Sequence, residues 1–186
     1  ETGNARYPIR FLFFAGHIQE AVMKRFAWIG AVVALLVATA ALEPAAEGSK
    51  KPVPYPDSYR DWTHVKSMVI QAGHPLYDAF GGIHHVYANE KSIKAMKAGK
   101  PYPDGSVLVF DLLEVKAEAG ALTEGPRKVL GVMRKDSRAY RETGGWGFEG
   151  FKADTRERVV KDMKKDCFAC HEPQKETDYT FSRYRR

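Results

Sequence analysis

The chain has 186 residues, of which 29 are Lys or Arg and 23 are Asp or Glu, so its formal net charge is +6. The length suits one ordinary domain once a short leader is removed. The basic residues are scattered, many at three-residue spacings typical of solvated helix faces, so the charge predicts no nucleic-acid partner. The basic C-terminal residues 183–186 could still meet an acidic redox partner protein.

The N-terminal region has the layout of a secretory leader. Residues 1–22 precede the first plausible start, Met23, and are interpreted as an upstream extension or an added sequence outside the fold. Met23-Lys24-Arg25 is a short basic region, residues 26–37 are apolar without interruption, and residues 38–40 are small or polar. This order predicts a signal peptide over 23–40 and therefore export to the periplasm.

A permanent membrane anchor is the alternative that stays open. Residues 26–42 give 17 predominantly apolar positions, which is the lower limit for a spanning helix. Residues 41–56 are rich in Ala, Pro, Lys and Glu and are predicted to form an extended or disordered linker. The folded domain is then expected over residues 57–186.

Apolar periodicity and turn residues predict an α+β domain. The expected elements are a helix over 57–71, a strand over 84–88, a helix over 90–98, a turn over 101–105, strands over 106–115, 128–134 and 146–151 with a loop before the second of these, and a last helix from residue 154. Asn89 is placed to cap the second helix and Gly99 to end it, and Gly105 can take a positive φ in the turn. Asp154 and Glu157 have capping-box spacing. We therefore expect a mainly antiparallel β-sheet with two or three flanking helices, the last at the C-terminus.

The run Cys167-Phe168-Ala169-Cys170-His171 has the spacing of a c-type haem attachment signature. Each thiol would form a thioether with one haem vinyl group, and His171 would be the proximal ligand of the iron. A zinc site needs more thiols or a spaced histidine pair, and the chain has only two cysteines. A redox dithiol remains the alternative, but it gives the following histidine no role. The sequence thus predicts one covalently attached haem c on the last helix.

The sixth position of the iron is expected to be open. All five methionines precede His171 and suit helix faces or strands, so a His/Met cytochrome is disfavoured; they are Met23, Met68, Met96, Met133 and Met163. A bis-His electron-transfer haem would draw on His64, His74, His84 or His85. Because His84 and His85 are adjacent in a predicted strand, their side chains should point to opposite sides of it. We expect each histidine to be a surface or hydrogen-bonded structural residue.

Four polar side chains are candidates for a place near the haem propionates or the distal side. They are Arg127, Arg134, Arg138 and Glu149, and the sequence does not rank them. A four-helix-bundle cytochrome is excluded because residues 101–153 are rich in β-branched stretches and paired glycines rather than long helical periods.

Four stretches in series resemble the cytochrome P460 family. They are Tyr59-Arg60-Asp61-Trp62, the turn and strand from Pro103 to Val109, Thr143-Gly144-Gly145-Trp146-Gly147-Phe148, and Cys167-Phe168-Ala169-Cys170-His171-Glu172. The resemblance covers about Tyr55 to Thr177. It implies a mainly antiparallel β domain with flanking helices, commonly a homodimer.

One position departs from the hydroxylamine-oxidising members of that family. Those proteins carry a lysine joined covalently to the porphyrin on the strand after the Pro-Asp-Gly turn, six residues beyond the position of Asp104. This chain has Phe110 there, and the nearest downstream lysine is Lys116. The pattern resembles the cytochrome c′-β subgroup, in which aromatic residues cap a five-coordinate haem.

An aromatic cap implies selective binding of small gases. Phe110 is the first candidate for the cap, Phe80 the second and Phe151 a reserve. A cap without hydrogen-bond donors does not stabilise bound O₂, so NO and CO are the expected ligands. The predicted function is gas capture, detoxification or sensing in the periplasm, and a homodimer is expected. A P460-type enzyme oxidising hydroxylamine or NO and an electron-transfer cytochrome remain alternatives.

Overall fold

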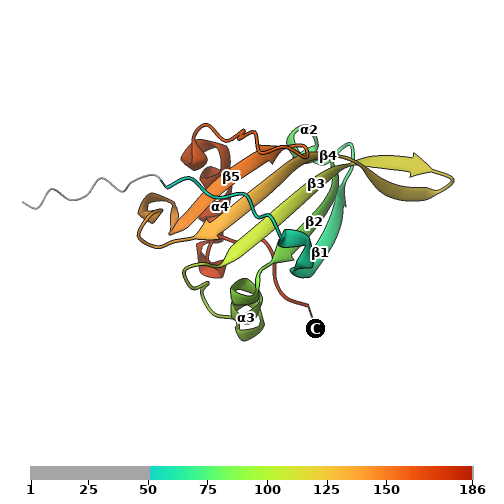
Figure 1. Ribbon diagram of the computed structural model, residues 1–186. Helices are drawn as coiled ribbons and strands as arrows, with labels where there is room; N and C mark the ends of the chain where they lie inside the picture. The colour runs from blue at the N-terminus through green and yellow to red at the C-terminus, as the bar shows by residue number, and fades with distance from the viewer. Residues whose placement is uncertain (1–50, 186) are drawn as a thin grey trace, which may run out of the picture. The chain divides into compact units, whose positions relative to one another are not determined.

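Five antiparallel strands form one sheet in the order β1-β2-β3-β4-β5, so each strand pairs with its neighbour in the chain (Figure 1). The strands are β1 (Thr63–Ile70), β2 (Gly82–Ala88), β3 (Val107–Glu118), β4 (Ala121–Lys135) and β5 (Trp146–Lys152). With the helices described below, this arrangement confirms the predicted α+β fold.

The computed structural model describes residues 51–185. The predicted extension over 1–22, the signal peptide over 23–40 and the linker residues 41–50 lie outside the described residues. No helix within residues 51–185 combines the length and apolarity needed to cross a membrane.

The first predicted helix is wrong. Residues 57–71 form a 3-10 turn, η1 (Tyr59–Asp61), followed by β1. Apolar residues there recur at helical spacing, but β1 is rich in β-branched residues and pairs along its length with β2. A register shift between His64 and Lys66 interrupts the simple alternation that would have identified a strand.

The second predicted helix is confirmed, with both of its ends. Helix α3 runs over Glu90–Ala98, and the Asn89 side chain accepts a hydrogen bond from the Ser92 N–H at 3.0 Å. Gly99 ends the helix in the left-handed conformation, with φ of 61°. Gly105 takes a φ of +85° in the following turn, also as expected.

The loop predicted before residue 128 is instead part of a long hairpin between β3 and β4. Lys116 pairs with Thr123, and the hairpin turns at Ala119 and Gly120, which have φ values of 50° and 80°. Positive φ at both central residues is the geometry of a tight hairpin turn. The tip of this hairpin projects beyond the rest of the sheet (Figure 1).

The last helix begins later than predicted. Residues 153–162 contain no helix, and Phe151 forms an antiparallel bridge with Arg158. A π-helical turn, η3 (Lys164–Phe168), then continues into α4 (Ala169–His171) and a 3-10 helix, η4 (Glu172–Thr177). We call the residues from 163 to 177 the C-terminal helical segment. It carries both cysteines, as expected.

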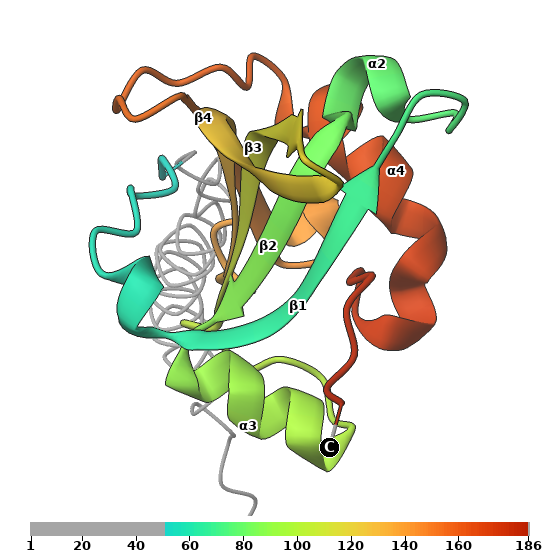
Figure 2. The ribbon, with the colours of Figure 1, turned by 90° about the vertical axis from the view of Figure 1, so that its right-hand side faces the viewer.

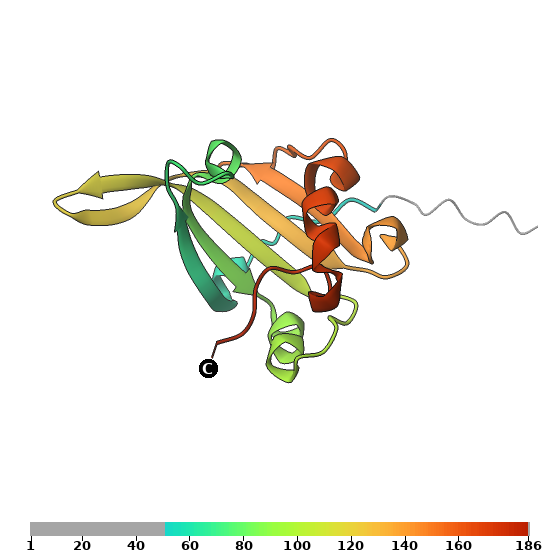
Figure 3. The ribbon, with the colours of Figure 1, turned by 180° about the vertical axis from the view of Figure 1, so that it is seen from behind.

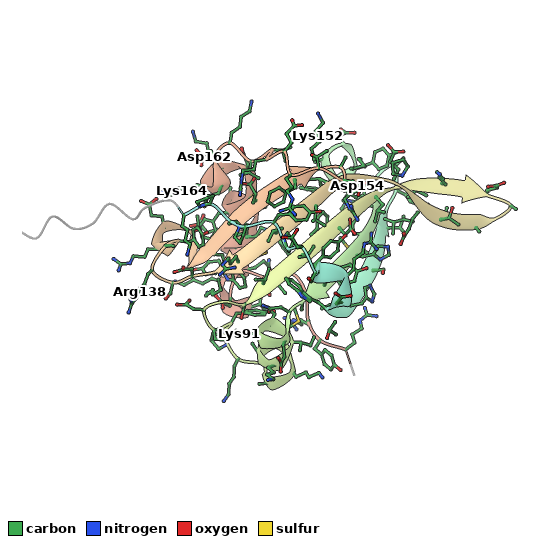
Figure 4. The ribbon with its side chains drawn as sticks, viewed as in Figure 1. Lys91, Arg138, Lys152, Asp154, Asp162 and Lys164 are labelled. Atoms are coloured by element: carbon green, nitrogen blue, oxygen red, sulfur yellow. The ribbon has the colours of Figure 1, made fainter. Side chains whose placement is uncertain are left out.

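Asp162, not Asp154, caps this segment. Its Oδ1 accepts a hydrogen bond from the Lys164 N–H at 3.0 Å, and the Asp166 carboxylate accepts one from the Asp162 N–H at 2.9 Å. Asp162 and Lys164 lie together at one end of the segment, whereas Asp154 lies near Lys152 after β5 (Figure 4). The cap predicted at Asp154 therefore lies eight residues before the actual cap, Asp162.

The two faces of the sheet pack against different parts of the chain. On the front face, which Figure 1 shows, Val109, Leu130 and Phe151 pack with Tyr59 and Val53. Val53 is 2% exposed, so residues 51–56, assigned to the linker from sequence, lie against the domain. On the back face, α2 (Tyr77–Phe80) and the C-terminal helical segment lie on the same side of the sheet (Figures 2 and 3).

Candidate functional site

The two thiols lie over the back face of the sheet. Cys167 packs against the cluster that contains Leu108, Trp146 and Phe148, whereas Cys170 is exposed. Residues three apart on a helix share one side, so both thiols can reach one flat group. Burial, reinforced by the negative charge of Asp166, raises the pKa of the Cys167 thiol to about 12. Both cysteines are free thiols rather than a disulfide.

His171 is held in the form that binds a metal. Its Nδ1 lies 2.8 Å from the carbonyl oxygen of Tyr179. A carbonyl only accepts, so Nδ1 carries the proton and Nε2 keeps a free lone pair. Burial also lowers the pKa of His171, which favours the neutral ring. Phe148 and Phe181 each place a ring centroid 4.9 Å from the imidazole.

A left-handed turn positions the Tyr179 carbonyl. Asp178 and Tyr179 have φ values of 50° and 62°, which are uncommon for residues with side chains. The Asp178 carboxylate accepts hydrogen bonds from Lys135 Nζ at 2.6 Å and from the Tyr102 N–H at 2.8 Å. Its carbonyl accepts one from Trp146 Nε1 at 2.9 Å. These contacts hold the strained turn in place, and sequence reasoning missed all of them.

Phe110 and Phe80 come together on the back face. Phe110 lies two residues after Leu108 on β3, so both side chains point to the same face of the sheet. This is the face of the cluster that contains Cys167. Phe80 ends α2, and its ring centroid lies 6.0 Å from that of Phe110 at an interplanar angle of 87°. Gly131 on β4 lies opposite Phe110. A Cβ added to Gly131 would lie 3.3 Å from the Phe110 ring.

Phe151 lies on the other face of the sheet. It is 1% exposed in the front-face core, with the Tyr55 ring at 4.9 Å and the Arg158 guanidinium at 5.1 Å. Phe151 therefore cannot share a pocket with Phe110. The prediction that it is a reserve candidate for the cap is wrong.

The predicted opposition of His84 and His85 is confirmed. His84 is 1% exposed on the back face, with its ring centroid 4.6 Å from that of Phe110. Its Nε2 lies 2.5 Å from the carbonyl oxygen of Phe80. His85 is directed to the other side, where it contacts Ser67 at 2.7 Å and Glu124 at 2.6 Å. His84 is thus a hydrogen-bonded structural residue, but one in contact with the aromatic pair.

The other two histidines take part in local surface hydrogen bonds. His64 Nε2 lies 2.9 Å from the Ser67 hydroxyl, and His74 Nδ1 accepts from the Leu76 N–H at 3.1 Å. These contacts agree with the expected structural roles.

Three of the four polar candidates from sequence, Arg127, Glu149 and Arg138, lie away from the aromatic pair. Arg127 is on the front face, where its Nε donates to Asp111 at 2.6 Å and its Nη2 to the Tyr59 hydroxyl at 2.6 Å. The Asp111 carboxylate is fully buried. Glu149 pairs with Arg158 at 2.5 Å. Arg138 is exposed (Figure 4).

The groups on the back face fit a haem. Two thiols on one side of a helix could attach it, an imidazole with a free Nε2 could be its proximal ligand, and an apolar aromatic pair could cover it. The Tyr179 carbonyl binds Nδ1 and so orients the imidazole, as partners of metal-bound histidines commonly do.

Comparison with known proteins gives one family. The cytochrome P460 family model matches residues 56–182. No curated protein matches the chain.

Proposed function

Because the chain belongs to the cytochrome P460 family, and therefore to a family of haem proteins, we propose that it is a periplasmic mono-haem c-type cytochrome that binds NO and CO. Cys167 and Cys170 attach the haem, and His171 is its proximal ligand. When bound, the haem supplies an iron that coordinates a diatomic gas. The observation that carries the proposal is the Phe80–Phe110 pair on the same side of the sheet as His171.

The proximal residues prepare a neutral, fixed imidazole. The Tyr179 carbonyl accepts the Nδ1 proton at 2.8 Å, and the rings of Phe148 and Phe181 limit rotation of His171. The alternative tautomer would lose this hydrogen bond. The chain thus offers Nε2 to the iron without rearrangement.

The distal residues select among ligands by size and polarity. The rings of Phe80 and Phe110 present carbon and no N–H or O–H donor, so they give little stabilisation to a ligand with a negative outer oxygen. Phe110 also replaces the amine that resemblance places here in hydroxylamine-oxidising relatives. These features favour gas binding over oxidation of hydroxylamine.

An absorption spectrum of the purified holoprotein separates the three functions. We expect high-spin, five-coordinate haem in the ferrous state. A strongly red-shifted and broadened Soret band would support the oxidising enzyme, and sharp low-spin ferrous bands without added ligand would support an electron-transfer cytochrome.

Substitution of Phe110 tests the cap directly. Phe110→Ala should speed CO association measured by flash photolysis, because the ring no longer restricts access to the iron. It should also lower stability by up to about 5 kcal/mol, so folding must be verified by circular dichroism. Phe151→Leu, a core substitution on the opposite face, is the matched control and should leave the CO rate unchanged. Equal CO rates for Phe110→Ala and wild type would remove Phe110 from the cap.

A further inference from the structure

The short segment that carries Phe80 is held to the sheet by few contacts. No residue of α2 is buried, and Leu76, Tyr77 and Phe80 are 48%, 44% and 37% exposed. Packing alone therefore stabilises the position of α2 weakly. Figure 3 shows α2 at the edge of the back face, where the chain passes from β1 to β2.

Two side chains from different strands bind consecutive carbonyls at the end of α2. His84 Nε2 on β2 lies 2.5 Å from the Phe80 carbonyl oxygen, and Lys128 Nζ on β4 donates to the Gly81 carbonyl at 2.8 Å. Both donors reach across from the sheet, so together they tie the end of α2 to it. We call these two contacts the α2 latch.

His84 also contacts the second ring of the cap. Its imidazole packs edge-on against Phe110, with centroids 4.6 Å apart and an interplanar angle of 80°. One residue thus binds the backbone of Phe80 and the side chain of Phe110.

The Phe80 carbonyl determines which ring nitrogen of a neutral His84 carries the proton. The carbonyl can only accept, so Nε2 carries the proton and Nδ1 has a lone pair. Nδ1 is buried and has no hydrogen-bond partner among residues 51–185. Burial, together with the charges of Lys128 and Lys66, lowers the pKa of His84, which keeps the ring neutral. The latch therefore consists of one neutral and one cationic donor.

We propose that His84 is a positioning residue for the distal side, which holds Phe80 against Phe110 through the α2 latch and so sets the rate at which a gas reaches the iron. This inference rests on the proposed function of the two rings. Opening of the latch moves α2 and Phe80 outward and uncovers Phe110. Gas access then depends on how often the latch opens.

The main test compares two substitutions of His84 in the holoprotein. His84→Leu removes the donor, and CO association should become roughly three- to tenfold faster, the change in open population that loss of one hydrogen bond produces. His84→Gln keeps an N–H donor near the Nε2 position and should restore a rate close to that of wild type. His85→Leu, next in sequence but on the other side of β2, should have no effect.

A double substitution shows whether His84 acts through Phe80. If it does, His84→Leu should have no further effect on the CO rate in a Phe80→Ala background. An unchanged rate in His84→Leu, with a faster rate in Phe80→Ala, overturns the latch and leaves the proposed function intact. Unchanged rates in both Phe80→Ala and Phe110→Ala would instead overturn the proposed function.

Limited proteolysis gives a readout that does not depend on gas binding. Chymotrypsin should cleave after Leu76 and Tyr77 several-fold faster in His84→Leu than in wild type or His85→Leu. If His84→Leu fails to fold, Lys128→Met releases the neighbouring contact and should show the same faster cleavage and CO association. Wild-type values for a folded Lys128→Met protein would then overturn the latch.

Discussion

At the residue scale, Asp111 combines complete burial with a full set of charged partners. Arg127 binds both of its carboxylate oxygens, at 2.6 and 3.1 Å, and the Tyr59 hydroxyl donates at 2.7 Å. The same cluster raises the pKa of Tyr59, through burial first and then through the hydrogen bond to Asp111. Removal of one partner would leave the other charge buried without compensation.

We therefore expect Asp111→Asn to destabilise the fold by about 3–5 kcal/mol, measured by urea unfolding of the holoprotein. The paired substitution Asp111→Leu with Arg127→Met should cost less, because no uncompensated charge remains. The haem spectrum should be unchanged in each folded variant, since the cluster faces away from Cys167. An Asp111→Asn protein with wild-type stability would contradict this account.

Substitution of Gly131 tests whether the exact position of the Phe110 ring controls gas binding. In Gly131→Ala, the new Cβ would lie 3.3 Å from Cδ1 of Phe110, so the ring must move by a few tenths of an ångström. The crowding should cost roughly 1–3 kcal/mol and should change the CO association rate. The rate change should vanish when Phe110→Ala is also present, because the displaced ring is gone. Its persistence in that background would show that Gly131 acts on another group.

At the scale of elements, the cap of the C-terminal helical segment predicts an acid response. Desolvation opposes ionisation of Asp162, but hydrogen bonds from the Lys165 and Lys164 N–H groups outweigh it and hold the pKa of Asp162 below its usual range. The carboxylate is therefore bound more strongly in the folded state. Its stabilising effect is complete above the unfolded pKa of about 3.9 and is lost as the pH falls through the lower folded value.

Asp162→Asn keeps a good capping side chain but cannot titrate. Below about pH 4, the stability of Asp162→Asn should fall less steeply with decreasing pH than that of wild type, as measured by far-ultraviolet circular dichroism. Asp61→Asn is the control, because Asp61 is exposed and its side chain makes no hydrogen bond or ion pair with residues 51–185, so its acid transition should not show this change. Parallel acid transitions for Asp162→Asn and wild type would remove the assigned cap.

Elements with local chemical signals were predictable from sequence. Asn89 and Gly99 mark the ends of α3 through their own side-chain or backbone preferences, and Gly105 marks a turn in the same way. The helix expected over 57–71 was wrong because the spacing of apolar residues within one segment does not show that a strand elsewhere in the chain, β2, will pair with it. The helix start near Asp154 was wrong because Asp154 and Asp162 both have side chains that can cap a helix. Only the packing of the folded chain shows that Asp162 does so.

The candidate site also contains some features that have a signal in the sequence and others that do not. Haem attachment at Cys167, Cys170 and His171 could be predicted because the motif depends on close spacing in the chain. The contact between His84 and the Phe80 carbonyl, and that between His171 and the Tyr179 carbonyl, involve backbone acceptors. A backbone carbonyl carries no residue-specific signal, so these orienting contacts could be found only in the fold.

At the scale of the whole molecule, the two edges of the sheet differ. The β5 edge is protected by the bridge from Phe151 to Arg158 and by a hydrogen bond from the Val159 N–H to the Gly150 carbonyl at 2.9 Å. Among residues 51–185, β1 pairs only with β2, and Val69 on it is 42% exposed. An open apolar edge favours association with another strand.

We therefore predict a homodimer that uses the β1 edge. Sedimentation should show a dimer at micromolar concentration, and Val69→Lys should shift it to the monomer by placing a charge at the contact. Val159→Lys is the matched control, since Val159 is also 42% exposed but lies beside β5. A monomeric wild-type protein would remove the prediction, and a dimer insensitive to Val69→Lys would place the interface elsewhere.

The alternation of β3 has a consequence for insertions and deletions. Phe110 faces the back of the sheet and Asp111 the front, so a shift of one residue would exchange them. A buried carboxylate would then face the aromatic pair, while Arg127 would lose its partner. Irregularities in the pairing with β4, on both sides of Leu113, help to hold the register. Descendants of this sequence should therefore vary along β3 by substitution, whereas length changes should accumulate in the projecting tip around Ala119 and Gly120.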